Sequence, residues 1–295
     1  MTTGTLPTNA PLTTTVETMP PVPAWTASSS AAPRKATPGP SFRRVVGSEW
    51  LKVTSVPSSW IIATTMIALS TAAGASLAYS ESSDPAGAAT DMAATTARTL
   101  APLGLVGQLF VVLLAVLVVA NEFSTGQVRA TYTAVPKRLP ILAARAAVAA
   151  VAVAVISVVS SIGAWAASSV VLSTVGVHTS LVDPQVLETV GANTAYLMLL
   201  AVFGVGLATI VKNAAAALSA AFGVLFVLPI AAALVLTTTS IDMSTLMLSY
   251  ADTIMSNLLS GSEAWGELPR DLGTIAAWIG VPFLIAAGIT RHRDV

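Results

Sequence analysis

The apolar positions of the chain gather in long runs that polar segments separate. Six runs, at about 60–79, 101–120, 146–172, 195–211, 214–236 and 274–290, are each long enough to cross the membrane as a helix. Only Lys212 and Asn213 separate the fourth run from the fifth, which predicts a tight antiparallel hairpin. Pro229 and Pro282 lie inside runs and predict kinks there. The pattern therefore predicts an all-α integral membrane protein with six transmembrane helices.

Two segments precede the first run. Residues 1–40 are rich in Thr, Pro and Ala, which predicts a disordered tail that is not a secretory signal. Residues 41–54 place apolar and charged side chains on different faces of a helix, which predicts an N-terminal helix lying in the headgroup layer. An ordinary linker is the alternative. The apolar residues are Phe42, Val45, Val46, Trp50 and Val53, and the charged ones are Arg43, Arg44, Glu49 and Lys52.

The segment before the last run, about 237–273, has an apolar stripe of its own at helical spacing. The stripe predicts an element that lies on the outer leaflet or is half inserted into it. A loop helix packed on its own bundle is the alternative. The stripe consists of Leu246, Met247, Tyr250, Ile254, Leu258 and Leu259.

The basic residues indicate the orientation, because Lys and Arg are enriched in loops that stay in the cytoplasm. With both termini in the cytoplasm, only Arg98 and Arg270 lie outside, and twelve of the 14 basic residues agree with the rule. We therefore predict a multi-pass protein of the cell membrane with a cytoplasmic tail, 1–40, and a six-span domain, 41–295. The cytoplasmic set is Arg34, Lys35, Arg43, Arg44, Lys52, Arg129, Lys137, Arg138, Arg145, Lys212, Arg291 and Arg293.

Composition agrees with a membrane protein and argues against several functions. The 295 residues are 54% hydrophobic and 9% charged, against about 25% charged in soluble domains. The formal net charge is +0, and no basic patch interleaved with aromatic residues predicts nucleic-acid binding. The chain has no cysteine, and its only histidines, His178 and His292, are predicted on opposite membrane faces, so we expect no metal site.

Catalytic signatures are missing from the sequence. It has no GxxxxGK[ST] phosphate loop, HExxH or GxSxG motif, so we expect no enzyme activity in this chain. None of the six runs, as bounded above, contains a charged residue or a histidine, which argues against a proton-coupled transporter. Ser157, Ser160 and Ser161 follow one another along the third run. They are candidates for a solute path, with helix packing as the alternative.

The most informative segment, 121–138, joins the second and third runs. It is polar and basic, and Ser124 or Thr125 can cap a short helix that Pro136 ends. We expect a rigid cytoplasmic projection suited to docking another protein. Glu122 is predicted to pair with Arg129 or with a cation of a partner. The alternative is a basic loop attracted to anionic lipid headgroups.

At this segment the sequence resembles the membrane permease subunit of a type-two, exporter-like ATP-binding-cassette (ABC) transporter. The resemblance rests on Glu-Phe-Ser-Thr-Gly at 122–126, Arg129, Val-Pro-Lys-Arg at 135–138 and the run from Leu142 to Arg145. Six spans, cytoplasmic termini, an interfacial helix and a half-inserted element before the last span are also similar to that family. The resemblance covers about 41–295.

The resemblance implies a coupling helix that seats in a groove of a separate cytoplasmic ATPase subunit. ATP and magnesium would bind that partner, and the solute path would lie between this chain and a second permease, as a homodimer or heterodimer. Arg145 stands where the family usually has Lys. The residues assigned to the coupling element are Glu122, Gly126, Arg129, Pro136, Lys137 and Arg138.

A second hypothesis comes from a different class of protein. The chain would then be a membrane anchor or sensor that recruits a cytoplasmic protein without moving a solute. A passive channel is a weaker prediction, because no run supplies a ring of charge or a filter signature.

Overall fold

The computed structural model describes residues 1–2, 41–124, 138–236, 253–255, 257 and 268–292. Contacts divide the chain into two units, Met1–Pro38 and Gly39–Val295, and the helices discussed below belong to the second. In the described ranges every regular element is helical and none is a strand, which confirms the all-α prediction. The tail predicted at 1–40 lies almost wholly outside these residues.

Six helical stretches within the described part of the chain are long and apolar enough to span a membrane, as predicted. The second of them is formed by two helices that meet at Ala101, and the fifth and sixth each contain a short π-helical turn. In chain order the elements of the spans are α2 (Pro57–Glu81), α4 (Met92–Leu100), α5 (Pro102–Ser124), α7 (Arg138–Ser173), α8 (Pro184–Val211), α9 (Ala214–Phe222), η1 (Gly223–Val227), α10 (Leu228–Leu236), α12 (Leu268–Ile275), η4 (Ala276–Gly280) and α13 (Val281–His292).

The helices extend beyond the apolar runs that predicted them. The third span was expected from 146, but α7 begins at Arg138, so Arg145 lies two turns inside this helix. Glu122 likewise belongs to the last turn of α5, because that helix continues past residue 120 to Ser124. The six runs themselves contain no charged residue, but the spanning stretches are longer and include Arg98 and Arg145, whereas Glu122 lies just beyond the second stretch, which ends at Ala120.

Side-chain caps account for several of the helix boundaries. Asp183 precedes α8, and its Oδ1 accepts a hydrogen bond of 3.0 Å from the backbone N–H of Gln185. Lys212 ends α8 in the left-handed conformation with φ 58°. Asn213 then caps α9 by accepting a bond of 3.0 Å from the N–H of Ala216. These two residues form the tight turn that the sequence predicted, because one terminates a helix and the next starts another.

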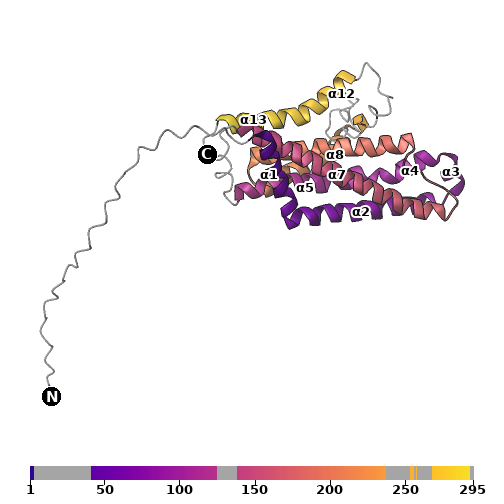
Figure 1. Ribbon diagram of the computed structural model, residues 1–295, viewed down its shortest axis with the longest axis horizontal. Helices are drawn as coiled ribbons and strands as arrows, with labels where there is room; N and C mark the ends of the chain where they lie inside the picture. Colours follow the sequence, from indigo (N-terminus) through magenta and orange to yellow (C-terminus); the bar gives the residue numbers. More distant parts are fainter. Residues whose placement is uncertain (3–40, 125–137, 237–252, 256, 258–267, 293–295) are drawn as a thin grey trace. The chain divides into compact units, whose positions relative to one another are not determined.

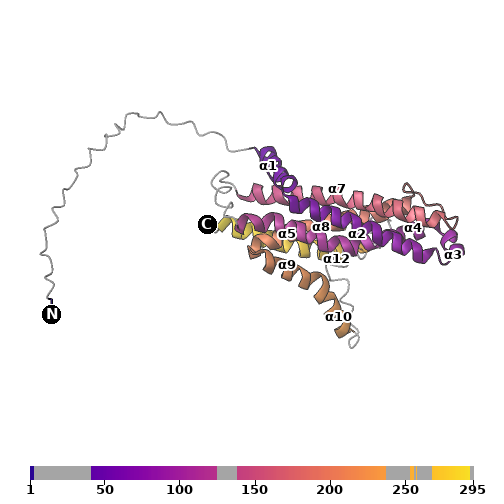
Figure 2. The ribbon, with the colours of Figure 1, turned by 90° about the horizontal axis from the view of Figure 1, so that it is seen from below.

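Helices α2, α5, α7 and α8 lie side by side and form the body of the bundle (Figure 1). Its core is apolar and tightly closed, with Val116 and Val119 of α5 and Leu197 and Leu200 of α8 fully buried. In Figure 2, α9 lies against this body, next to α5 and α8, and α10 projects away from it. Many side chains of the fifth and sixth spans are exposed, including Ile230 and Leu284.

Helix α1 (Phe42–Ser55) runs across one end of the bundle, next to the start of α7 (Figures 1 and 2). The predicted helix at 41–54 is therefore present, although its apolar residues divide between two faces. Val45 and Val53 pack on α7, whereas Phe42 and Trp50 are 52% and 39% exposed. Charged Glu49 is buried between the two valines.

Pro229 and Pro282, the two prolines predicted to distort spans, each follow a π-helical turn. Turn η1 ends two residues before Pro229, and turn η4 ends two residues before Pro282. A π-helical turn widens the backbone, which accommodates a residue that lacks an N–H donor. The predicted distortions at both prolines thus take the form of a wider turn. The half-inserted element expected at 237–273 lies mostly outside the described residues.

The contact between α2 and α7 depends on a small residue. A Cβ added at Gly74 of α2 would lie 3.0 Å from the Cβ of Ala164 and 3.1 Å from its carbonyl oxygen. Close approach of backbones through small residues is the usual way in which membrane helices associate. Gly288 of α13, in contrast, has open space where a Cβ would lie.

We predict that Gly74→Val destabilises the bundle by about 1–3 kcal/mol through overpacking. Gly288→Val, the matched control, should change stability little. The free energy of unfolding of the detergent-purified chain measures both effects. Equal stability of the two variants would contradict the close α2–α7 contact.

Candidate functional site

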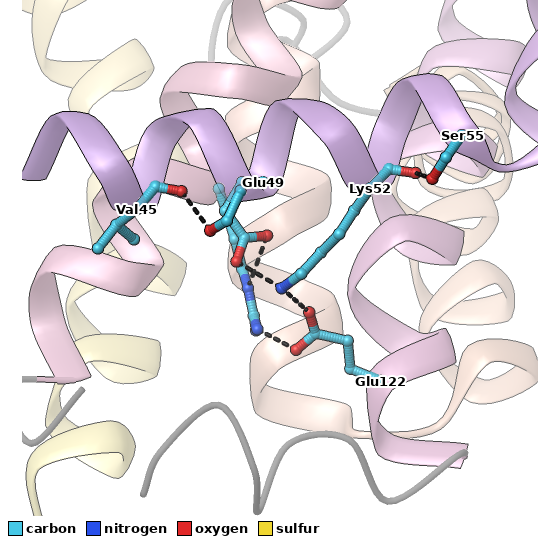
Figure 3. Close-up of polar contacts among 7 residues, drawn as sticks. Val45, Glu49, Lys52, Ser55 and Glu122 are labelled. Atoms are coloured by element: carbon cyan, nitrogen blue, oxygen red, sulfur yellow. Dashed lines mark hydrogen bonds and ion pairs between the residues drawn. The ribbon is translucent and has the colours of Figure 1, made fainter. Parts of the chain in front are cut away.

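Four charged side chains from three helices meet at the end of the bundle that α1 covers (Figure 3). Lys52 Nζ of α1 lies 2.7 Å from Glu49 Oε1, one turn away on the same helix, and 2.6 Å from Glu122 Oε1 of α5. Arg145 of α7 donates from Nη2 to Glu122 Oε2. Its Nε lies 3.5 Å from Glu49 Oε2. We call these four residues the charge ring.

Opposite charges alternate around the charge ring. Each carboxylate has one oxygen toward Lys52 and the other toward Arg145. Two acids and two bases give no net charge, so an uncompensated charge is not left inside the protein. This matters because desolvating an unpaired ion costs several kcal/mol.

Three of the four residues are almost completely buried. Glu49, Arg145 and Glu122 are 2%, 3% and 4% exposed, whereas the Lys52 side chain is 34% exposed. The ring is therefore closed on the side of α7 and partly open at Lys52. Burial weakens solvent screening, so removing one member should be far more costly than breaking an ion pair on the surface.

The ring is positioned by apolar residues that lie on either side of Glu49 on α1 and on either side of Arg145 on α7. On α1, Val45, Glu49 and Val53 recur every four residues and form one face. On α7, Ile141 and Ala144 contact Val45, while Val148 and Ala152 contact Val53. Arg145 lies between these two groups on the same side of α7. The apolar contacts on either side of Arg145 therefore hold Glu49 of α1 opposite Arg145 of α7.

One side of the ring is looser than the others. Glu49 Oε2 and Arg145 Nε form an ion pair at 3.5 Å, yet neither atom makes a hydrogen bond to any described residue. The sides that involve Lys52 and Glu122 are hydrogen-bonded. Glu122 is therefore hydrogen-bonded to both cations and links the end of α5 to α1 and to α7.

The structure brings Glu122 together with residues that the sequence did not single out as its partners. The predicted partner, Arg129, lies outside the described residues, so that pairing stays a prediction. The signal that was missed is Arg145, a lone charge at the start of a long apolar run. Glu49 and Lys52, one turn apart on a helix of otherwise mixed character, were a second signal.

The other candidate residues are only partly described. Gly126, Arg129, Pro136 and Lys137 lie outside the described residues, and Arg138 is the first residue of α7. The ring thus includes one residue from each of the two helices that flank 125–137.

The three serines proposed as a solute path are fully buried in α7. Ser157 Oγ lies 3.0 Å from Thr194 Oγ1 of α8, and Ser161 donates to the carbonyl oxygen of Ser157 at 2.9 Å. Ser160 Oγ has no hydrogen-bond partner in the described part of the chain. The contacts of Ser157 and Ser161 are those of helix packing, and the solute path stays a prediction.

Two cavities lie beside α5. The first, of about 410 Å³, adjoins the ring and includes Lys52 and Glu122 in its wall. The second, of about 480 Å³, separates α5 from α9 and η1 and is mostly apolar, with Gln108 and Ser219 as its polar residues. Gln108 Oε1 accepts a hydrogen bond of 2.8 Å from Tyr196 Oη.

Neither the protein-family models nor the curated proteins compared with the chain match it. The resemblance to ABC permeases therefore rests on the residues quoted from the sequence and is carried forward as a proposal.

We predict that Glu122→Gln destabilises the chain by about 3–5 kcal/mol, because Lys52 and Arg145 lose a shared counter-charge in a buried site. Glu81→Gln is the matched control. Glu81 pairs with Arg98 at 3.0 Å, but the Arg98 side chain is 54% exposed, so the expected cost is at most about 1 kcal/mol. Chemical unfolding in detergent measures both values, and similar losses in the two variants would contradict the buried ring.

Proposed function

We propose that the chain is the membrane permease subunit of an ABC transporter, an exporter that takes its energy from a separate ATPase subunit. The observation that carries this proposal is the position of the charge ring. Glu122 lies at the end of α5 and Arg145 near the start of α7, so the ring connects the two helices that flank segment 125–137. A force applied to that segment would reach α5, α7 and α1 together.

The proposed mechanism begins with docking of the ATPase on the segment from Glu122 to Arg138. ATP-driven closure of the ATPases pushes this segment, and the ring keeps the helix ends from separating under load. The movement then passes to α8, which packs on both α5 and α7, and to α2, which packs on α7. Tilting of these helices opens the solute path toward the opposite side of the membrane.

The distribution of charge supports the proposed sidedness. Arg43, Arg44, Lys52, Arg145 and Lys212 lie on α1 or at helix ends on the side of the bundle that α1 covers. Placing this end in the cytoplasm agrees with the enrichment of basic residues there. Segment 125–137 would then face the compartment that contains ATP.

A second permease subunit would complete the proposed transporter. The described helices expose apolar side chains along the fifth and sixth spans, among them Phe222, Val227, Ile230 and Leu284. Such faces contact lipid or another membrane protein. They are therefore the surfaces on which a second permease, identical or different, would pack.

Reversing charge in the docking segment tests the proposal. We expect Arg129→Glu combined with Lys137→Glu to abolish co-purification of an ATPase with the tagged full chain, and with it the ATP hydrolysis of the purified complex. Arg98→Gln, at the other end of the bundle, is the control and should leave both unchanged. If the charge-reversed variant keeps its ATPase, or if the wild-type chain brings down a kinase or regulator and no ATPase, the transport proposal fails and the anchor hypothesis gains.

A further inference from the structure

The first cavity has a polar end and an apolar end. It lies between the α1–α2 junction and α5. Lys52, Ser58 and Ser59 line the polar end, at the level of α1, and Ile62, Leu114 and Val118 line the part that continues between α2 and α5. A volume of about 410 Å³ is within the range of small-molecule sites, about 300–1,000 Å³. This combination suits an amphiphile whose polar group stays near α1.

The polar end favours an anion. Helix α2 is 25 residues long and begins here, with Val56 at its N-cap and no side chain capping its first N–H groups. Such an N-terminus carries partial positive charge and attracts phosphate groups. Lys52 adds a hydrogen-bond donor, because its ammonium group has three N–H groups and the ring uses two of them.

The hydroxyl of Ser59 gives independent support for a ligand. Ser59 is only 9% exposed and lines the cavity, yet its hydroxyl has no hydrogen-bond partner among the described residues. The Ser58 hydroxyl, on the same wall, likewise has none in that part of the chain. Ser58 is half-buried, and neither hydroxyl is among the fully enclosed polar atoms, so both are open to the cavity. A ligand oxygen in the cavity would satisfy both.

Glu122 also lines the cavity, and its negative charge would repel an anion if it were not paired. Both of its oxygens already face cations, Oε1 toward Lys52 and Oε2 toward Arg145. Because the ring has no net charge, the partial positive charge at the start of α2 determines the sign of the field at the polar end, and Lys52 contributes its remaining N–H donor. The site therefore accepts a negative group beside an already neutralised carboxylate.

We propose that this cavity binds one membrane phospholipid, with its phosphodiester at Lys52, Ser58, Ser59 and the start of α2. The first part of an acyl chain lies against Ile62, Leu114 and Val118. Free phosphate could use only the polar half, and a neutral diacylglycerol only the apolar half. This inference does not depend on the transport proposal, since it uses only the membrane location of the helices and the chemistry of the cavity wall.

The experiment uses the full chain, delipidated in detergent, and measures bound lipid by native mass spectrometry. Phosphatidylglycerol, dioleoylglycerol and inorganic phosphate are added separately over a range of concentrations. We expect saturable binding of one phosphatidylglycerol and no comparable binding of the other two. Ser59→Ala should weaken this binding about tenfold, the value of a hydrogen bond to a charged group.

A pair of filling variants provides the matched control. Leu117 lines the proposed site and Leu113 lines the second cavity, and both residues belong to α5. Leu117→Trp should abolish binding of phosphatidylglycerol, and Leu113→Trp should leave it unchanged.

Several results would overturn the proposal. They are wild-type binding in both Ser59→Ala and Leu117→Trp, equal binding of dioleoylglycerol, saturation by inorganic phosphate alone, or no binding to the wild-type chain. If Leu117→Trp fails to fold, Ser59→Ala still decides the matter, because it removes one oxygen atom and adds no volume.

Discussion

Four charged side chains with no net charge, three of them buried, hold α1 against the end of α5 and the start of α7. Each carboxylate faces both cations, so no single contact carries the arrangement. The apolar contacts of Val45 and Val53 with α7 fix its register, and the charges make other registers costly, because a shift would leave buried ions unpaired. We therefore expect the ring to contribute more to the specificity of this register than to net stability. On the transport proposal, that property suits a junction that has to keep its geometry while the ATPase pushes on it.

The rest of the bundle follows the rules of helices in lipid. Helix backbones approach closely where a small residue allows it, as at Gly74 against Ala164. Hydroxyl groups such as that of Ser161 donate hydrogen bonds to backbone carbonyl groups of their own helix. The two spans interrupted by Pro229 and Pro282 each contain a π-helical turn, and they are also the spans whose apolar side chains are most exposed. The distorted helices therefore face lipid or a partner. The regular helices α2, α5, α7 and α8 form the buried body.

The six spanning stretches in the described part of the chain could be predicted from hydrophobicity alone, because a spanning helix requires a long apolar run. The turn at Lys212 and Asn213 could be predicted as well, because one helix has to end and the next has to begin at these two residues. The charge ring could not be predicted in the same way. Its members are separated by up to 96 residues in the chain, from Glu49 to Arg145. A hydropathy pattern also ends at the first charged residue, although the helix itself can continue past that residue. Glu122 was identified from its local sequence, but its partners depend on how α1 crosses α7.

A double-mutant cycle between Glu122 and Arg145 tests the central claim most directly. It compares the free energies of unfolding of the wild-type chain, Glu122→Gln, Arg145→Gln and the double variant in detergent. The ring predicts that the double variant loses less stability than the two single losses added together, by about 1–3 kcal/mol, because the second substitution removes a charge that the first has left unpaired. Losses that add to within about 0.5 kcal/mol would show that α5 and α7 are not joined through these residues.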